Sequence, residues 1–213
     1  MGVVCYSRPV RALLIATDNR GKRAEYKSLL APFRATLRFP DQLGLQVVAR
    51  EAGRSYAENA AIKALSHAQA SGLATLADDS GLEVDALGGE PGLYSARYAG
   101  EKASDADRYR LLLEKLTAVP WERRTARFRC CVVLAKPDGR THTAEGVCEG
   151  VIALEPRGEH GFGYDPVFYL PEHGRTLAQL PSEVKNRLSH RARALEKLLP
   201  TLTHVLRESP EEG

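Results

Sequence analysis

Long apolar runs and paired cysteine motifs are both missing from this 213-residue sequence. No stretch approaches the roughly 20 apolar residues that a membrane-spanning helix needs, and residues 1–8 are too short and too polar for a signal peptide. The cysteines form neither a C-x-x-C motif nor zinc-finger spacing with histidine; they are Cys5, Cys130, Cys131 and Cys148. We therefore expect reduced thiols in a cytoplasmic protein that has no membrane partner.

A strong charge of either sign is missing as well. Lys and Arg number 30 against 27 Asp and Glu, a net charge of +3, and no basic aromatic platform accompanies it. This balance argues against a nucleic-acid-binding protein, so positive charge for an anionic ligand must be concentrated locally. Without repeats or linkers, we expect a single domain over residues 1–213, with an N-terminal extension at 1–9 and a frayed tail at 208–213.

The sequence does contain short apolar runs that alternate with helical segments. The apolar runs predict strands at Val10–Thr17, Thr36–Phe39, Gln46–Ala49 and Leu73–Ala77. Helical spacing and capping residues predict helices at Lys22–Leu30, Ser55–Ser71, Ser104–Leu116, Ser182–Leu188 and Ser189–Leu206. Two further strands flank a Pro-Asp-Gly turn and predict an antiparallel hairpin, Thr125–Lys136 with Thr141–Leu154. This mixture indicates an α/β fold with a mixed sheet and flanking helices.

The first candidate site lies between the first predicted strand and helix, at Thr17-x-Asn19-x-x-Lys22. A helix start offers unpaired backbone N–H groups and the positive end of the helix dipole, and Lys22 adds a full charge. Gly21 allows a ligand to come close to the backbone. These features favour a phosphate site, although neither the P-loop pattern nor the dinucleotide pattern is present. The alternative is an ordinary turn with a helix cap.

The second candidate site is Asp78-Asp79-Ser80-Gly81, which we expect to end the strand at Leu73–Ala77. Both carboxylates should be ionised at neutral pH, and oxygen ligands of this kind suit Mg²⁺ bound together with phosphate. Asn59 and Lys63 lie four residues apart, on one helix face, with Glu51 and Glu58 nearby in sequence. The alternatives are a hydrogen-bonded turn and a solvated helix face.

Two further groups lie in the last third of the chain. Gly161–Pro166 surrounds an aromatic residue with glycines, which predicts a mobile loop that presents Phe162 to a flat ligand; the alternative is a buried aromatic in a tight turn. Ser189 is expected to cap a helix that has His190 and Arg191 in its first turn, with Lys185 just before it. Because a cation there opposes the helix dipole, an anionic or carbonyl-bearing ligand would explain its presence.

Five segments together resemble the inosine triphosphate pyrophosphatase family, also described as Ham1-like. They occur in the family's order: TDNRGK, SYAENAAIKA, LADDSGLEVDALGGEPGLYSARYAG, GFGYDPVF and EVKNRLSHRARAL. The resemblance implies two lobes around a nucleotide cleft, a homodimer, and Mg²⁺-dependent cleavage between the α- and β-phosphates. It further implies that the substrates are non-standard purine triphosphates, namely ITP, dITP and XTP, which are converted to the monophosphate and pyrophosphate.

The resemblance also assigns roles to residues. It makes Asp79 the catalytic base and Mg²⁺ site, with Glu51 as a second metal ligand. The implied substrate contacts are Thr17, Asn19, Lys22, Lys63, Ser80, Phe162, Gly163, Tyr164, Asp165, Lys185, His190 and Arg191. A donor from Arg191, from His190 or from the backbone of their helix would read the carbonyl at position 6 of the base.

Three positions depart from the family's pattern. Asp18 replaces a usual glycine beside the expected phosphates, Arg50-Glu51 replaces an acidic pair, and Gln179 replaces a usual glutamate. We expect Asp18 to point away from the phosphates. Two alternatives stay open: a Maf-like pyrophosphatase for other modified nucleotides, and a nucleotide-binding regulator without turnover. The run SHR and the loop GFGYDP argue against the first, and the intact Asp78-Asp79 pair argues against the second.

Overall fold

One seven-stranded mixed sheet runs through the molecule in the order β2-β1-β3-β4-β5-β6-β7. The computed structural model describes residues 11–33, 35–49 and 52–208, so the expected extension at 1–9, Cys5, Glu51 and the end of the tail lie outside the described residues. The strands are β1 Arg11–Ile15, β2 Ala35–Arg38, β3 Thr75–Val84, β4 Thr125–Ala135, β5 Thr141–Ile152, β6 Phe168–Leu170 and β7 Arg175–Thr176. Strand β1 pairs in parallel with β2 and β3, and the other pairs are antiparallel, which confirms the mixed sheet and the hairpin.

Within the described residues, five α-helices flank this sheet: α1 Arg20–Leu30, α2 Tyr56–Ser71, α3 Asp105–Lys115, α4 Ser182–Leu188 and α5 His190–Glu208. Helix α2 begins at its predicted cap, because the Ser55 side chain accepts from Glu58 N, and it ends at Gly72 in the left-handed conformation. In β4, Cys130 packs with α1 and α5 while Cys131 packs with the alanines of α2. Adjacent strand residues point to opposite faces, so α2 covers one face and α5 the other. Cys130, Cys131 and Cys148 are free thiols, as expected.

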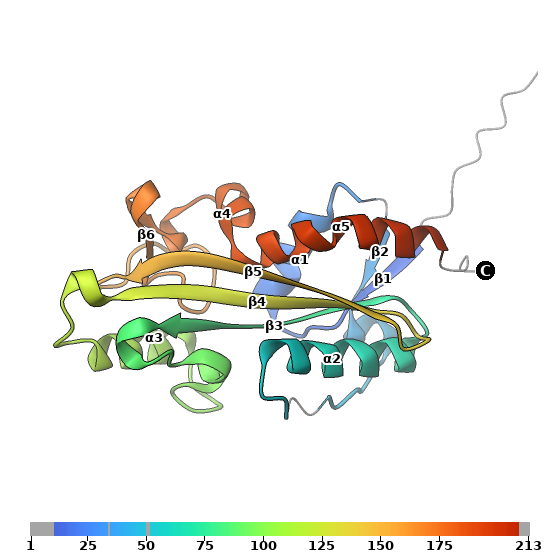
Figure 1. Ribbon diagram of the computed structural model, residues 1–213, viewed down its shortest axis with the longest axis horizontal. Helices are drawn as coiled ribbons and strands as arrows, with labels where there is room; N and C mark the ends of the chain where they lie inside the picture. The colour runs from blue at the N-terminus through green and yellow to red at the C-terminus, as the bar shows by residue number, and fades with distance from the viewer. Residues whose placement is uncertain (1–10, 34, 50–51, 209–213) are drawn as a thin grey trace, which may run out of the picture.

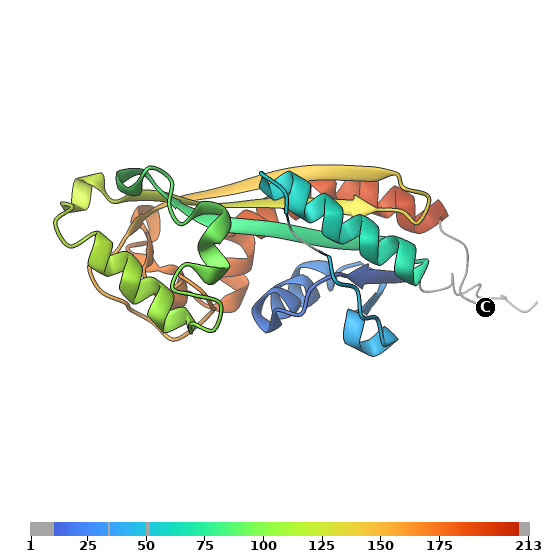
Figure 2. The same cartoon turned by 90° about the horizontal axis from the view of Figure 1, so that it is seen from below.

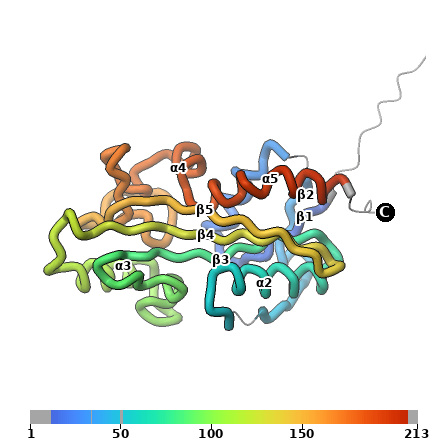
Figure 3. The backbone as a smooth tube through the Cα atoms, viewed as in Figure 1, coloured from blue at the N-terminus to red at the C-terminus, as the bar shows by residue number. Residues whose placement is uncertain are grey.

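Two halves of the molecule have separate cores. The cores at one end contain α1, α2, α5 and β1. The core at the other end contains residues of α3, the β6 region and the far ends of β3, β4 and β5. Figures 1 and 2 show an elongated molecule in which these three long strands pass through both halves, and the tube in Figure 3 follows them from end to end. The two expected lobes are therefore joined by continuous strands.

The structure corrects the sequence predictions for two segments next to the sheet. The acidic segment does not end a strand, because β3 continues through Asp78–Gly81 and pairs with β4 from Thr75 to Val84. This long pairing overrides the local turn preference of Asp, Ser and Gly. Residues 46–49 form no strand in the structure; they follow the turn at Gly44 without pairing to the sheet.

The short length of β1 leaves one edge of β3 open. β1 pairs with β3 at only two positions, Leu14 with Thr75 and Ile15 with Leu76, whereas β3 runs on to Val84. The carbonyl of Ala74 accepts from Leu14 N in β1, and the carbonyl of Leu76 accepts from Ala16 N, one residue after β1 ends. Because main-chain groups alternate in direction along a strand, the Asp78 carbonyl points to this same edge, beyond the end of β1.

Gly146 sets the closest approach of α5 to the sheet. A Cβ atom at this position would lie 2.1 Å from the His190 carbonyl oxygen and 2.4 Å from the Ala194 nitrogen. Both atoms belong to the helix backbone, which cannot turn aside as a side chain can. We predict that Gly146→Ala lowers the free energy of unfolding by about 1–3 kcal/mol or more, measured by urea denaturation. Thr143→Ala, at an exposed position of the same strand, is the control, and equal stability of the two variants would contradict this account.

Candidate active site

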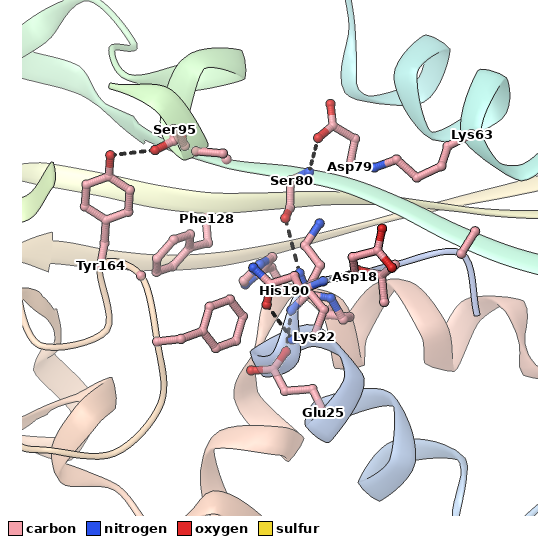
Figure 4. Close-up of a pocket in the computed structure, with 18 of the residues that line it drawn as sticks. Asp18, Lys22, Glu25, Lys63, Asp79, Ser80, Ser95, Phe128, Tyr164 and His190 are labelled. Atoms are coloured by element: carbon pink, nitrogen blue, oxygen red, sulfur yellow. Dashed lines mark hydrogen bonds and ion pairs between the residues drawn. The ribbon is translucent and has the colours of Figure 1, made fainter. Parts of the chain in front are cut away.

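A cavity of about 600 Å³ lies where the two halves meet. Every described residue to which the resemblance assigned a role lines it, whether it comes from the first loop, from α1, from α2, from β3, from the glycine-rich loop or from the C-terminal helices. They are Thr17, Asn19, Lys22, Lys63, Asp79, Ser80, Phe162, Gly163, Tyr164, Asp165, Lys185, His190 and Arg191. Figure 4 shows Lys63, Asp79 and Asp18 toward one end of this cavity and Tyr164 with Ser95 toward the other.

The loop between β1 and α1 is held by its own side chains. The Asn19 side chain caps α1, accepting from Lys22 N at 3.0 Å, and the Thr17 hydroxyl accepts from Asn19 N at 3.2 Å. Asp18 is 88% exposed and pairs with Arg23 at 3.1 Å, but it also lines the cavity, so our expectation that it points away from the site is not confirmed. The helix therefore starts at Arg20, two residues before the predicted start, with no acidic side chain in its first turn.

Two lysines from different helices meet at the open edge of β3. The Nζ atoms of Lys22 and Lys63 donate to the Asp78 carbonyl at 3.5 and 3.3 Å. Lys22 also pairs with the Asp78 carboxylate at 2.9 Å. The backbone carbonyl that β1 leaves unpaired thus holds two ammonium groups together at the cavity wall.

The two adjacent aspartates do not face each other. Asp78 is buried and bonds to Arg191, while Asp79 accepts from Asn59 Nδ2 at 3.0 Å and from Ser80 N at 3.0 Å. Neighbouring residues of a continuous strand project to opposite faces, so the two carboxylates do not form one joint cation site. Burial would raise the pKa of Asp78, but Arg191, Lys22 and Lys63 outweigh it and hold that pKa below its usual range.

A buried carboxylate that the sequence analysis did not single out, Glu25, connects the C-terminal cations. Its oxygens pair with Lys185 Nζ at 2.8 Å and with Arg191. Lys185 also lies 2.5 Å from Asp165 Oδ2. Burial favours a higher pKa for Glu25, yet Arg191 and Lys185 reverse the effect and lower it to about 2. In the sequence, Glu25 stands out only by its position one helical turn after Lys22, and a surface residue is just as typical at such a position.

The glycine-rich loop brings aromatic rings to the cavity. Phe162 is half-buried, its ring lies 4.7 Å from Lys185 Nζ, and a Cβ at position 21 would lie 2.3 Å from it. Gly21 is therefore required by the approach of this ring. Tyr164 is buried, and its hydroxyl donates to the Ser95 carbonyl at 2.9 Å. Phe162 faces the cavity as predicted, whereas Tyr164 is anchored in the wall.

His190 is a neutral member of the site. Its ring stacks on Phe128 at 4.8 Å between centroids with an interplanar angle of 14°. Burial, reinforced by the charge of Arg191, lowers the His190 pKa to about 3. At the start of α5, His190 is therefore uncharged, and the charge of the neighbouring Arg191 is balanced by Asp78 and Glu25.

Within the described residues, no three His, Cys, Asp or Glu side chains are grouped as a metal site. Asp79 is the carboxylate on the cavity wall at the open strand edge, and the other expected ligand, Glu51, lies outside the described residues. One carboxylate still fits Mg²⁺, because this ion usually binds one or two carboxylates and completes its shell with substrate phosphates and water.

These features define an α/β protein whose two halves enclose a polar cleft that is lined by lysines, carboxylates and aromatic rings. The chain belongs to the Ham1 family, whose model matches residues 13–201. It is 49% identical over 203 residues to a dITP/XTP pyrophosphatase of Desulforamulus reducens, covering 91% of this chain and 96% of the relative. A relative of the same name from Thermus thermophilus is 51% identical over 187 residues, covering 88% and 89%. A HAM1 protein of Coxiella burnetii superposes with a TM-score of 0.82 at 42% identity, covering 92% of this chain and 100% of that one.

The burial of neutral His190 predicts a specific pH dependence of stability. The imidazole takes up a proton near its ordinary pKa of 6.5 when the chain is unfolded, but its pKa is only about 3 when the chain is folded. Between these values the unfolded state binds more protons, so stability falls as pH falls. We predict that His190→Gln removes a slope of up to about 1.4 kcal/mol per pH unit between pH 6 and pH 4, measured by urea unfolding at several pH values. Parallel curves for the variant and the wild type would contradict a neutral buried His190.

Proposed function

We propose that this chain hydrolyses the triphosphates of non-standard purines, ITP, dITP and XTP, to the nucleoside monophosphate and pyrophosphate, and so removes them from the nucleotide pool. The observation that carries the proposal is the polarity of the cleft. Lys63 and Asp79 lie toward one end of the cavity and Tyr164 lies toward the other (Figure 4). Lys22 and Phe162 line the same cavity, and the Phe162 ring lies against Gly21 at the start of α1. This arrangement suits a ligand that is polyanionic at one end and flat at the other.

The phosphate end supplies charge in two forms. The capped start of α1 offers backbone N–H groups, and the two lysines bring full positive charges from α1 and α2. Triphosphate oxygens are better acceptors than the Asp78 carbonyl, because hydrogen bonds to charged acceptors are stronger. On binding, Lys22 and Lys63 would shift their hydrogen bonds toward the substrate and stabilise negative charge on the leaving pyrophosphate.

Asp79 is the proposed base. Asn59 Nδ2 and Ser80 N hold its two oxygens from separate directions, which fixes the carboxylate plane at the open strand edge. An ionised carboxylate held this way orients a water molecule and accepts its proton as the oxygen attacks the α-phosphate. Asp79, together with phosphate oxygens of the substrate, would hold Mg²⁺, which neutralises the charge that develops in the reaction.

The start of α5 is proposed to select the base at its position 6. Hypoxanthine and xanthine have a carbonyl there, whereas adenine has an amino group. The donors available are the remaining N–H of Arg191 and the backbone of its helix start, since Arg191 already donates to Asp78, Glu25 and Ser80. These partners hold the Arg191 side chain in place. When adenine is bound, its amino group therefore faces the arginine N–H, and neither donor has an acceptor.

The assembly and location that we propose are a homodimer in the cytoplasm. No helix in the described part of the chain is long and apolar enough to cross a membrane. Light scattering at several concentrations tests the dimer directly. A single mass equal to that of the 23.3 kDa chain at all concentrations would exclude it.

The first prediction from this function concerns the substrate and the bond that is cleaved. With Mg²⁺, ITP, dITP and XTP should be turned over about a hundredfold faster than ATP or CTP, judged by kcat/KM, because two mismatched polar contacts have an effect of this size. The product should be pyrophosphate and not orthophosphate, each assayed separately, and EDTA should abolish it. Tight binding of ITP without turnover would instead support the nucleotide-binding regulator. Activity confined to modified pyrimidine nucleotides would support the Maf-like alternative.

The second prediction concerns Asp79. Asp79→Asn keeps the hydrogen-bonding size of the side chain but can neither accept a proton nor contribute charge to a metal site. We expect kcat to fall about 10²- to 10⁴-fold and the Mg²⁺ concentration for half-maximal rate to rise, with the unfolding midpoint unchanged within error. Asp138→Asn, in the exposed turn between β4 and β5, is the matched control. A rate within a few-fold of wild type would remove Asp79 from the mechanism.

A further inference from the structure

Arg108, in the first turn of α3, lines the cavity but belongs to none of the motifs that predicted it. Its side chain is 18% exposed, so most of it lies inside the wall. Ser104 caps α3 and Asp107 returns a hydrogen bond to the cap, which fixes where the first turn starts. The position of Arg108 is therefore set by a rigid helix start.

Arg108 is tied to the glycine-rich loop through one neighbour. Its Nη1 donates to Asp105 Oδ1 at 2.6 Å, and Asp105 Oδ2 accepts from Gly163 N at 2.7 Å. Asp105 thus holds the arginine and the loop that contains Phe162 and Tyr164 together. These contacts place the guanidinium beside the aromatic end of the cleft.

Most donors of this guanidinium are not used by the protein. Of its five N–H groups, one on Nη1 donates to Asp105, and Nε has no hydrogen-bond partner among the described residues. By contrast, all three guanidinium nitrogens of Arg191 donate to protein oxygens, and Lys185 is held by two carboxylates. Nε is covered by the protein, so a ligand in the cavity would meet the terminal nitrogens of Arg108, which still have donors for an acceptor on that ligand.

We propose that Arg108 is a specificity-determining residue that donates to the carbonyl at position 2 of xanthine; the proposal rests on the function proposed above. Positions 6 and 2 lie on opposite sides of N1 in the purine ring. Arg191 reaches the cleft from α5 in one half of the molecule, and Arg108 reaches it from α3 in the other. A purine between them offers one of these two positions to each.

The chemistry of position 2 differs among the three 6-oxo purines. Xanthine has a carbonyl there, hypoxanthine a hydrogen, and guanine an amino group. A guanidinium has only donors, so it pairs with the first, is indifferent to the second and meets a second donor in the third. Arg108 thereby favours XTP and disfavours GTP, and the standard nucleotide is rejected at this position.

The test compares Arg108→Gln and Arg108→Lys with wild type in kcat/KM for XTP, ITP and GTP. Both variants should lose about 10- to 100-fold on XTP, change ITP by less than about threefold, and lower the preference of ITP over GTP. Arg110→Gln is the matched control, because that side chain is 71% exposed on the same helix and should leave all three values unchanged. Binding of XMP, IMP and GMP by calorimetry follows the same contrast without turnover.

Three outcomes would overturn the proposal. An equal loss on all three substrates would reduce Arg108 to an anchor for the glycine-rich loop. An equal loss on XTP and ITP, with GTP unchanged, would place the arginine at another edge of the base. No change on any of them, in rate or in monophosphate binding, would exclude it from base recognition. Failure of the wild type to hydrolyse ITP or XTP would refute the function itself, and the calorimetric contrast between XMP and GMP would still decide the role of Arg108.

Discussion

One buried set of opposite charges holds the cleft together: Glu25, Asp78, Asp165, Lys185 and Arg191. The members come from α1, β3, the glycine-rich loop, α4 and α5, so the set joins the parts of both halves that surround the cavity. Burying an isolated charge is strongly unfavourable in free energy, so each of these side chains is stable in the interior only while its partners are present. The network fixes side chains at the cleft, where they cannot turn away into water.

Around this network, the end of β1 determines where chemistry is possible. Had β1 continued, its backbone would cover the edge of β3 and occupy the Asp78 carbonyl that Lys22 and Lys63 now contact. Because β1 ends early, this edge of β3 presents polar groups to the cavity and does not form hydrogen bonds with a neighbouring strand. Gly21 then leaves room for the Phe162 ring beside the same loop, so that the phosphate end and the aromatic end are parts of one cavity.

Sequence patterns predicted the elements that depend on local rules and missed those that depend on pairing. Ser55, Gly72 and Ser104 marked helix ends correctly because caps act through neighbouring residues. The Asp-Asp-Ser-Gly segment was expected to end a strand, since no local feature of the sequence predicts ten residues of pairing with β4. For the site, the motifs found the residues at helix starts and loops. They missed Glu25 and Arg108, because the contacts of both residues join distant parts of the chain. Glu25 pairs directly with Lys185 and Arg191, and Arg108 is connected through Asp105 to the glycine-rich loop, more than fifty residues away.

The three long strands have a mechanical consequence. Because β3, β4 and β5 pass through both halves without a break in their pairing, no flexible linker exists in this described part of the chain at which one half could swing freely against the other. Any motion of one half against the other would therefore have to twist the sheet itself, and the cost of that twist would be spread over the ladder hydrogen bonds of all three strands.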